Sequence, residues 1–365
     1  MRVALVHDWL VVNAGAEKVT KALRELYDAD VFAVVDFLGD ADRQELLGGR
    51  RARTSFIQQL PFARRIFRWY LPLFPKAIEW LDLGGYDLII SSSYAVAKGV
   101  RKRPGQVHVC YLHTPMRYAW VKEDEYLRDH GLRGPLAALV RWRLARLRAW
   151  DLRSNAGVDT FIANSRNVAE RVLRCYGRSA EVVHPPVDPE RFPLCTGPRA
   201  GYVVASRAVP YKRIDRIIEA FAGMPDRRLD ILGDGPERAR LQAMAPPNVR
   251  FHGHVRPDEL AAYLGGARAL VVAADEDMGL TPVEALACGT PVVALGRGGY
   301  LESVRDGVNG IHFPEPTPAA IRDAVERLEA HAWDPGSLRA TAAPFFLDAF
   351  RAEVSRIVAS AMAHA

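Results

Sequence analysis

Two glutamates near the end of the chain have a spacing that suits binding of a phosphorylated sugar. Glu276 and Glu284 are eight positions apart, with a Met-Gly-Leu-Thr-Pro turn between them. The apolar run at 267–274 is short, continuous and rich in valine, which predicts a buried parallel strand before the turn. The two carboxylates are therefore expected to lie at the carboxyl end of a strand, where they can bind sugar hydroxyls.

A helix is expected to begin inside this motif. Thr281 suits an N-cap, Pro282 suits the first turn, and Gly289 can end the helix. The free N–H groups of such a helix N-terminus attract an anion such as phosphate. An alternative stays open, because Thr281 and Glu284 also have the spacing of a simple capping box.

Cations and glycines with phosphate-binding potential occur in other loops. Arg207 and Lys212 are five residues apart after a predicted strand, where they can neutralise a diphosphate leaving group or simply be solvated loop cations. Gly15 lies in the loop NAGAEKV after the first strand, where backbone can approach a diphosphate. That loop has no GxGxxG, so a dinucleotide-dependent dehydrogenase is poorly supported.

The positions of these residues depend on the elements around them. At 365 residues, the chain is long enough for two domains. Short apolar runs alternate with helical patterns, which is typical of doubly wound parallel sheets. The Pro-rich segment 184–198 is interpreted as the linker, and the last helix at about 346–362 is expected to pack back across the domain junction. The predicted strands are 2–7, 30–35, 86–92, 106–113, 158–165, 200–207, 227–235, 249–255, 269–274 and 291–296.

Composition and charge narrow the class of protein. No run approaches the ~18 apolar residues of a membrane span, and the N-terminus has the pattern of a strand rather than of a signal peptide. The four cysteines have no metal-ligand spacing and fit reduced thiols in a cytoplasmic protein. The net charge is +6, and basic residues interleaved with aromatic residues fill 50–76. This stretch suits an anionic membrane surface or a nucleic acid, or is a solvated basic face over packed aromatic residues. Segment 141–150 predicts a second basic helix, which can instead be a buried-edge helix with a solvated arginine face.

The motifs together resemble those of retaining glycosyltransferases of family 4, which have the α/β GT-B architecture of two facing Rossmann-like domains with a central cleft. The similarity runs nearly end to end, and YLHTPMRYAW is most similar to the bacterial O-antigen mannosyltransferase subgroup, which uses GDP-mannose. The matching strings are NAGAEKV, YDLIISSSYAVAKG, YLHTPMRYAW, FIANS, VVHPPVDPERF, SRAVPYKRIDRIIEAF, ILGDGPE, VRFHGHV, EDMGLTPVEALACGTPVVA and GGYLESVRDGVNGIHF.

The resemblance implies a role for each matching residue. Arg207 and Lys212 would bind the donor diphosphate, Glu284 the ribose hydroxyls, and Glu276 a hydroxyl of the transferred sugar. His113 would reach that sugar near the reacting carbon. The remaining positions contribute mainly backbone: Gly15 over the phosphate, Asp277, Met278 and Gly279 beside the sugar, Leu280 and Thr281 toward phosphate, and Gly253, His254 and Val255 along the nucleobase.

The resemblance also implies domains and an activity. Residues 1–195 would bind the acceptor, 196–345 the nucleotide sugar, and 346–365 would return to the N-terminal domain. The expected enzyme moves mannose from GDP-mannose to a lipid-linked oligosaccharide at the cytoplasmic face of the cell membrane, which 50–76 contacts. A UDP-sugar or a GDP-deoxysugar donor stays an alternative, while nucleic-acid binding and non-catalytic sugar binding are remote ones. The family's Gly-Phe-Gly is Asp277-Met278-Gly279 here, so Asp275-Glu276-Asp277 mimics a metal-binding DxD, but no metal or other cofactor is expected.

Overall fold

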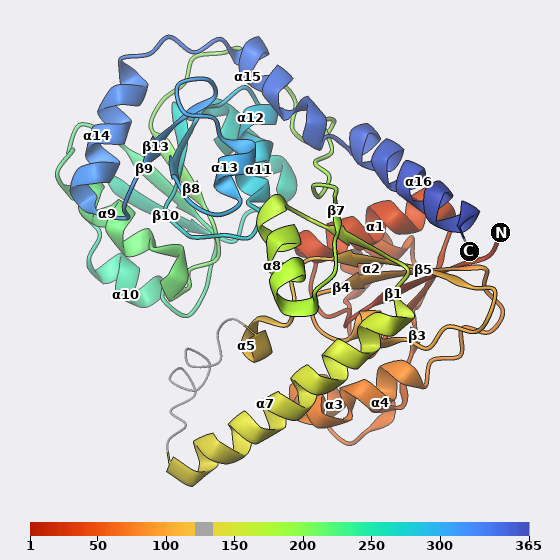
Figure 1. The fold of residues 1–365 in the computed structure, drawn as a ribbon. Helices are drawn as coiled ribbons and strands as arrows, with labels where there is room; N and C mark the ends of the chain where they lie inside the picture. Colours follow the sequence, from red (N-terminus) through yellow and green to blue (C-terminus); the bar gives the residue numbers. More distant parts are fainter. Residues whose placement is uncertain (121–133, 365) are drawn as a thin grey trace. The chain divides into compact units, whose positions relative to one another are not determined.

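The computed structural model describes residues 1–120 and 134–364, which form two compact units (Figure 1). Unit 1 comprises Met1–Pro185 with Phe350–Ala365, and unit 2 comprises Pro186–Ala349. Each unit contains one parallel sheet whose strands carry mostly buried side chains, as expected when helices cover both faces. The prediction of two doubly wound α/β domains is therefore confirmed.

The sheet of unit 1 has seven strands in the order β3-β2-β1-β4-β5-β6-β7. The order reverses between the neighbours β1 and β4, where the connecting segments leave in opposite directions along the sheet. The strands are β1 (Val3–His7), β2 (Asp30–Ala33), β3 (Arg53–Thr54), β4 (Leu88–Ser93), β5 (Val107–Leu112), β6 (Thr160–Ala163) and β7 (Glu181–Val182).

The helices of unit 1 include a long α1 with a strongly amphipathic sequence and an extended α7. They are α1 (Gly15–Tyr27), α2 (Asp40–Leu47), η1 (Phe56–Gln59), α3 (Ala63–Ile66), η2 (Phe67–Leu73), α4 (Phe74–Glu79), η3 (Ala97–Gly99), α5 (Arg117–Trp120), α7 (Gly134–Ser154), η4 (Asn155–Gly157) and α8 (Arg166–Tyr176).

The sheet of unit 2 has six strands in the order β10-β9-β8-β11-β12-β13, and its order reverses between β8 and β11. Two apolar clusters fill its two faces: one includes α9, α10 and α14, and the other includes α11, α12 and α15. The strands are β8 (Tyr202–Ala205), β9 (Leu229–Leu232), β10 (Val249–Gly253), β11 (Ala269–Val272), β12 (Val292–Leu295) and β13 (Gly310–Phe313). The helices are η5 (Pro210–Lys212), α9 (Ile214–Ala222), α10 (Arg238–Ala243), α11 (Pro257–Gly266), α12 (Leu280–Ala287), α13 (Tyr300–Ser303), α14 (Pro318–Glu329), α15 (Pro335–Ala342) and η6 (Ala343–Phe345).

The last helix, α16 (Leu347–Ala363), begins in unit 2 and continues into unit 1. Its start is joined to the start of unit 2, where the N–H of Val187 donates to Phe345 O at 2.9 Å. Further along, Phe350 packs edge-on against Tyr111, with ring centroids 5.9 Å apart, and Arg351 lies 3.6 Å from Glu25. The final helix thus packs on unit 1. None of the described helices is both long and apolar enough to cross a membrane.

The ten predicted strands all occur, with ends that differ from the prediction by at most three residues. Three further strands, β3, β7 and β13, were not predicted. Strands β3 and β7 are two-residue edge strands, too short for a periodic pattern, and β13 forms only by pairing with β12. The basic stretch 50–76 folds into short helical turns that bury Phe67 and Phe74 and expose Phe62 and Trp69.

Candidate functional site

The first candidate site lies where the strand order of unit 2 reverses. Connections after β8 and β11 diverge there, and in open α/β sheets ligands bind at such a point, outside the carboxyl ends of the strands. Lys212, at the end of η5, and Glu276, in the loop after β11, meet at this point. The ammonium Nζ contacts Glu276 Oε1 directly, and the two side chains are only 21% and 13% exposed. The structure therefore brings a predicted cation and a predicted carboxylate into one ion pair.

Glycines hold the loop that carries the cations. The loop after β8 packs against the Gly-Asp-Gly turn after β9, and a Cβ on Gly233 would lie 2.1 Å from Ser206 O. A Cβ on Gly235 would lie 2.4 Å from Ala208 O. Because only glycine permits this approach, the turn fixes the path of the segment that leads to Lys212.

Glycines also support the glutamate loop. The N–H of Gly299 donates to Glu276 O at 2.7 Å, and Gly298 has a φ of +61°. A Cβ on Gly298 would lie 2.5 Å from both Asp275 Oδ1 and Glu276 O. The glycine turn after β12 thus supports the loop from 275 to 278.

The helix expected after this loop is present, but its cap differs from the prediction. Gly279 is the N-cap of α12 and Thr281 is its second residue, so the prediction that Thr281 caps the helix is wrong. A Cβ at Gly279 would lie 2.2 Å from Tyr300 Cε1, so the ring of Tyr300 packs where a side chain would be. This contact fixes the extended backbone of Gly279 and starts the helix two residues earlier than predicted. Glu284, one turn into the helix, is 4% exposed.

The other predicted residues of unit 2 surround these elements. Arg207 is exposed, and no hydrogen bond or ion pair joins its side chain to any residue among 1–120 and 134–364. Gly253 ends β10 with a φ of +71°, and its carbonyl accepts the N–H of Gly233 at 2.6 Å. His254 is exposed and Val255 is half-buried. Backbone of the segment 253–255 is therefore available beside the strand ends.

The second candidate site lies at the reversal point of unit 1. His113 follows β5, is partly exposed, and places Nε2 2.9 Å from Ser92 Oγ. Burial in this pocket of β4, β5 and aromatic rings lowers the pKa of His113 to about 3, so the imidazole is neutral at physiological pH. Gly15 is the first residue of α1, after the N-cap Ala14. The residues predicted for one site thus divide between the two units.

Sequence reasoning missed the buried polar residues around His113. His7, Glu17 and Ser92 are 0%, 3% and 0% exposed and are joined by hydrogen bonds. Asp8, also fully buried, accepts the backbone N–H groups of residues 94–97 at 2.5–3.0 Å. A signal was available, because polar residues interrupt apolar strands at these positions in VALVHD and LIISSS.

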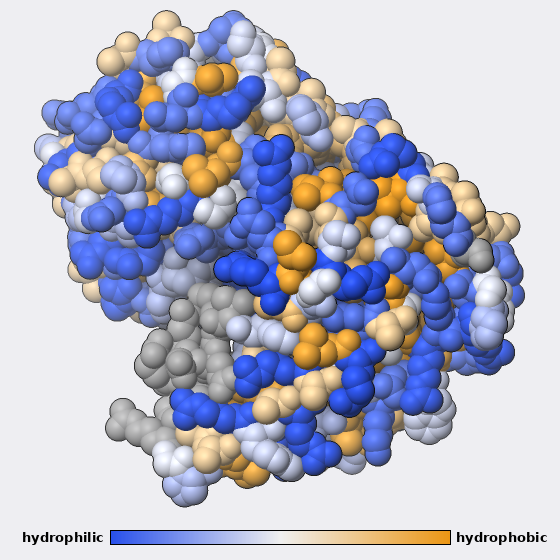
Figure 2. All heavy atoms as spheres, viewed as in Figure 1, coloured by the Kyte–Doolittle hydropathy of each residue, from blue (hydrophilic) through white to orange (hydrophobic). Residues whose placement is uncertain are grey.

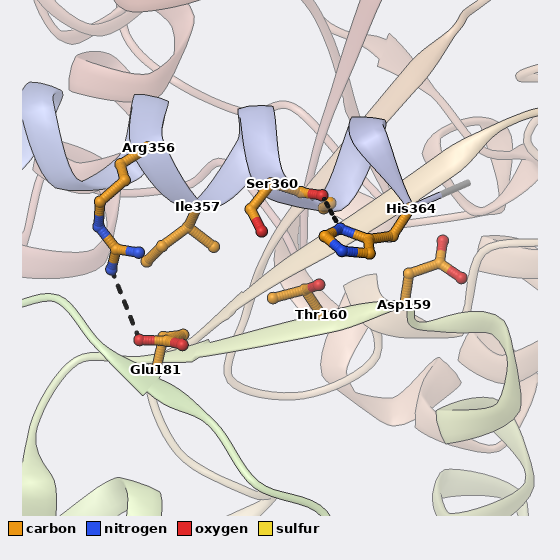
Figure 3. A pocket seen from close by; sticks show the side chains of 8 residues that line it. Asp159, Thr160, Glu181, Arg356, Ile357, Ser360 and His364 are labelled. Atoms are coloured by element: carbon orange, nitrogen blue, oxygen red, sulfur yellow. Dashed lines mark hydrogen bonds and ion pairs between the residues drawn. The ribbon is translucent and has the colours of Figure 1, made fainter.

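A hollow of about 400 Å³ opens elsewhere in unit 1, between α16 and the sheet edge (Figure 3). Arg356 and His364 of α16 line it together with Asp159 and Glu181, and Arg356 lies 3.6 Å from Glu181. Asp159 and Glu181 stand at the amino ends of β6 and β7, so this hollow is remote from the carboxyl ends that carry His113. Among the described residues, no three His, Cys, Asp or Glu side chains are grouped as metal ligands would be.

Comparison with protein families assigns this chain to a class. Residues 12–191 match the family model described as Glycosyltransferase Family 4, and residues 198–340 match Glycosyl transferases group 1. The chain therefore belongs to the glycosyltransferases of GT-B architecture. Two of the relatives that match are similar over about half of the chain. One is a D-inositol 3-phosphate glycosyltransferase of Streptomyces bingchenggensis, 33% identical over 50% of this chain and 47% of the relative.

The other relative is a GDP-mannose-dependent alpha-(1-6)-phosphatidylinositol monomannoside mannosyltransferase of Mycolicibacterium smegmatis, 33% identical over 48% of this chain and 54% of the relative. The chain thus spans about half the length of the curated relatives it matches. Among solved structures, Anabaena HepE with UDP-glucose covers 99% of this chain and 100% of its own at a TM-score of 0.71 and 20% identity. Sucrose-phosphate synthase of Thermosynechococcus elongatus covers 100% of both chains at a TM-score of 0.75 and 19% identity. These two structures share the fold.

Proposed function

We propose that this protein is a retaining glycosyltransferase that moves mannose from GDP-mannose to a lipid-linked oligosaccharide during assembly of a surface polysaccharide. The observation that carries the proposal is the Lys212–Glu276 ion pair, placed at the reversal point of a nucleotide-binding type of sheet and beside the N-terminus of α12. A cation, a carboxylate and free backbone N–H groups are what a sugar diphosphate requires of its site.

Each part of the donor would bind the groups of the site that complement it. The diphosphate takes Lys212 away from Glu276, with Arg207 as second cation and the N–H groups of Leu280 and Thr281 at the helix end. Glu276, released from the ammonium, accepts a hydroxyl of the transferred sugar, next to the backbone of Asp277, Met278 and Gly279. Glu284 accepts the ribose hydroxyls, and the backbone of Gly253, His254 and Val255 lies along the nucleobase.

The reaction would then need stabilisation of charge on the leaving diphosphate. Lys212 and Arg207 supply it, since preorganised cations act where charge develops as the glycosidic bond breaks. His113 and Gly15, from unit 1, would contribute at the sugar and the phosphate. In this scheme the acceptor attacks from the face that the diphosphate leaves, and a phosphate oxygen takes the proton of the acceptor.

The choice of GDP-mannose rests on the resemblance of YLHTPMRYAW and on the mycobacterial relative, whose name specifies that donor. A UDP-sugar is the second candidate, because the structure of HepE was solved with UDP-glucose. Thermal unfolding with GDP and with UDP separates the two, since a ligand that binds only the native state raises the Tm. A larger rise with GDP, followed by turnover of GDP-mannose with a lipid-diphosphate glycan, is expected. A rise of the Tm with UDP alone would show instead that the donor is a UDP-sugar.

The proposed site holds its diphosphate with Arg207 and Lys212 and therefore uses no divalent metal. Activity should persist in excess EDTA. Complete loss of activity, restored by Mn²⁺, would instead make Asp275 and Asp277 candidate ligands, although Asp275 is exposed and Asp277 is buried.

We also propose that unit 1 binds the anionic inner face of the cell membrane, where the acceptor lipid resides. In the stretch 50–76, Phe62 and Trp69 are 75% and 83% exposed, next to the exposed Arg64, Arg65 and Arg68. Exposed aromatic rings flanked by arginines suit the interface of an anionic bilayer.

The helix α7 extends this surface. Its Trp142 is 53% exposed between Arg141 and Arg143, while Leu144 and Leu147 are buried. Trp150, further along α7, donates from Nε1 to Glu79 Oε1 of α4 at 2.7 Å, so α7 and the basic stretch are neighbours (Figure 1). Hydrophilic and hydrophobic residues are mixed over this part of the surface (Figure 2).

Sedimentation with phospholipid vesicles tests the surface. The protein should bind vesicles that contain phosphatidylglycerol and not vesicles of phosphatidylcholine alone. The double variant Phe62→Ser, Trp69→Ser should lose this binding, whereas Leu173→Ser, on the 60% exposed side chain of Leu173 in α8, should keep it. Equal binding by both variants would refute the assignment.

A further inference from the structure

Unit 1 contains a buried chain of hydrogen bonds that starts on α1 and ends on His113. Glu17 and Thr20 belong to α1, His7 ends β1 and Ser92 belongs to β4. All four side chains are 0–3% exposed, and they meet where the strand order reverses. Burial of so many polar atoms is costly unless each has a partner, so the direction of every hydrogen bond is constrained.

Distances define the chain. Glu17 Oε1 lies 3.3 Å from His7 Nε2, and Glu17 Oε2 accepts the N–H of Ala14 at 3.1 Å. On the other side of the ring, His7 Nδ1 lies 3.1 Å from the backbone O of Ser92 and 3.0 Å from Thr20 Oγ1. Ser92 Oγ then lies 3.0 Å from Thr20 Oγ1 and 2.9 Å from His113 Nε2.

The acceptors in this chain decide where the protons are. An ionised Glu17 can only accept, and so can the carbonyl of Ser92; these two therefore call for a proton on each nitrogen of His7. A doubly protonated His7 is a cation paired with the Glu17 carboxylate, and it accepts nothing. The Thr20 hydroxyl lies 3.1 Å from the O of Ala16 and 3.0 Å from Ser92 Oγ. When its proton is donated to Ser92 Oγ, the Ser92 hydroxyl, with no acceptor left on His7, donates to His113 Nε2.

We propose that Ser92, held by the Glu17–His7 ion pair, is a positioning residue that fixes His113 as the neutral tautomer with its proton on Nδ1. The Nδ1–H group then faces away from Ser92 as a hydrogen-bond donor for an oxygen of the bound ligand. Burial is the main cause of the lowered pKa of His113, and the charge of the neighbouring His7 lowers it further. The use of Nδ1–H toward the transferred sugar rests on the proposed function, but the tautomer does not.

The matched control is on the same strand. Ser91, adjacent to Ser92 and equally buried, places Oγ 2.8 Å from Nε2 of another buried histidine, His108. Ser91→Ala and Ser92→Ala therefore each remove one serine hydroxyl from β4, and each hydroxyl lies beside a different imidazole. Glu17→Gln is the second probe, because glutamine can still accept the Ala14 N–H but carries no charge to pair with His7.

Protein labelled with ¹⁵N-histidine reports the tautomer directly, since protonated and unprotonated ring nitrogens have well-separated ¹⁵N shifts. Ligand-free wild-type protein at pH 7 should show His113 protonated on Nδ1 and His7 protonated on both nitrogens. Ser92→Ala should release His113 into a mixture of tautomers, Glu17→Gln should remove one proton from His7, and Ser91→Ala should leave both residues unchanged. His113 protonated on Nε2 in the wild-type protein would overturn the proposal without any variant.

Measurement of turnover tests whether the tautomer of His113 contributes to catalysis. With GDP-mannose and a lipid-diphosphate acceptor, Ser92→Ala should lower kcat about tenfold or more and Ser91→Ala should not, because a donor aimed at the reacting sugar would be lost only in the first. If the wild-type protein shows the expected tautomer but Ser92→Ala keeps the wild-type kcat, the role of His113 at the sugar is refuted. The hydrogen-bond assignment would then still stand.

Discussion

Replacing Lys212 by alanine tests the site of unit 2 through stability as well as through activity. Lys212 is a loop cation, and a fully exposed loop cation contributes little to folding. In the structure, however, it is only 21% exposed and its ammonium contacts Glu276, which is 13% exposed. Its removal leaves a mostly buried carboxylate without this partner.

The expected loss follows from that geometry. A hydrogen bond to a charged group contributes about 1.5–3 kcal/mol, and partial exposure of both side chains reduces this. Lys212→Ala should therefore lower the free energy of unfolding by about 1–2 kcal/mol. Arg207→Ala is the matched control, because Arg207 is exposed, and it should stay within about 0.5 kcal/mol of the wild-type protein.

Urea denaturation of Lys212→Ala, Glu276→Gln and the double variant measures the pair. The two single changes should be non-additive by about 1 kcal/mol, because each removes the same contact. Turnover with GDP-mannose should fall by about 10²–10³-fold in Lys212→Ala, equivalent to about 2.7–4 kcal/mol of transition-state stabilisation. Additive stabilities would refute the ion pair, and wild-type turnover in Lys212→Ala would refute the diphosphate role.

Three further changes probe other parts of the molecule. Glu284→Gln should weaken GDP binding by about 1–3 kcal/mol in calorimetric titration, with nearly unchanged stability; normal binding would exclude the ribose role. Asp8→Asn places an amide against four backbone N–H groups and should lower the unfolding free energy by about 2–4 kcal/mol in urea; no loss would contradict that geometry. Burial lowers the pKa of His108 to about 4, below its value of about 6.5 in the unfolded chain. Between these two pH values the unfolded state binds more protons than the folded state. The free energy of unfolding should therefore fall as the pH drops from 6.5 to 4. His108→Gln should reduce this dependence of the unfolding free energy on pH, measured by urea denaturation across the range. An unchanged dependence would show that other groups cause it.

The sequence identified the elements and the individual residues well because their signals are local. Apolar runs such as 269–274 locate buried strands. The paired Glu276 and Glu284 lie in the loop and the helix that follow one such strand. The fold class could be predicted on this basis, and the glycosyltransferase family from the resemblance of the motifs. The Ser92 and His7 network was missed because nothing in a strand pattern says which neighbouring strand a polar residue will face.

Tertiary structure decided what the local pattern left open. The start of α12 moved from Thr281 to Gly279 because the Tyr300 ring, from a later helix, packs against that glycine. Lys212 and Glu276 are 64 positions apart, and only the reversal of strand order between β8 and β11 brings them into contact. Residue types and local spacing are properties of the sequence alone, whereas ion pairs, burial and the protonation of imidazoles arise only when distant segments share one sheet.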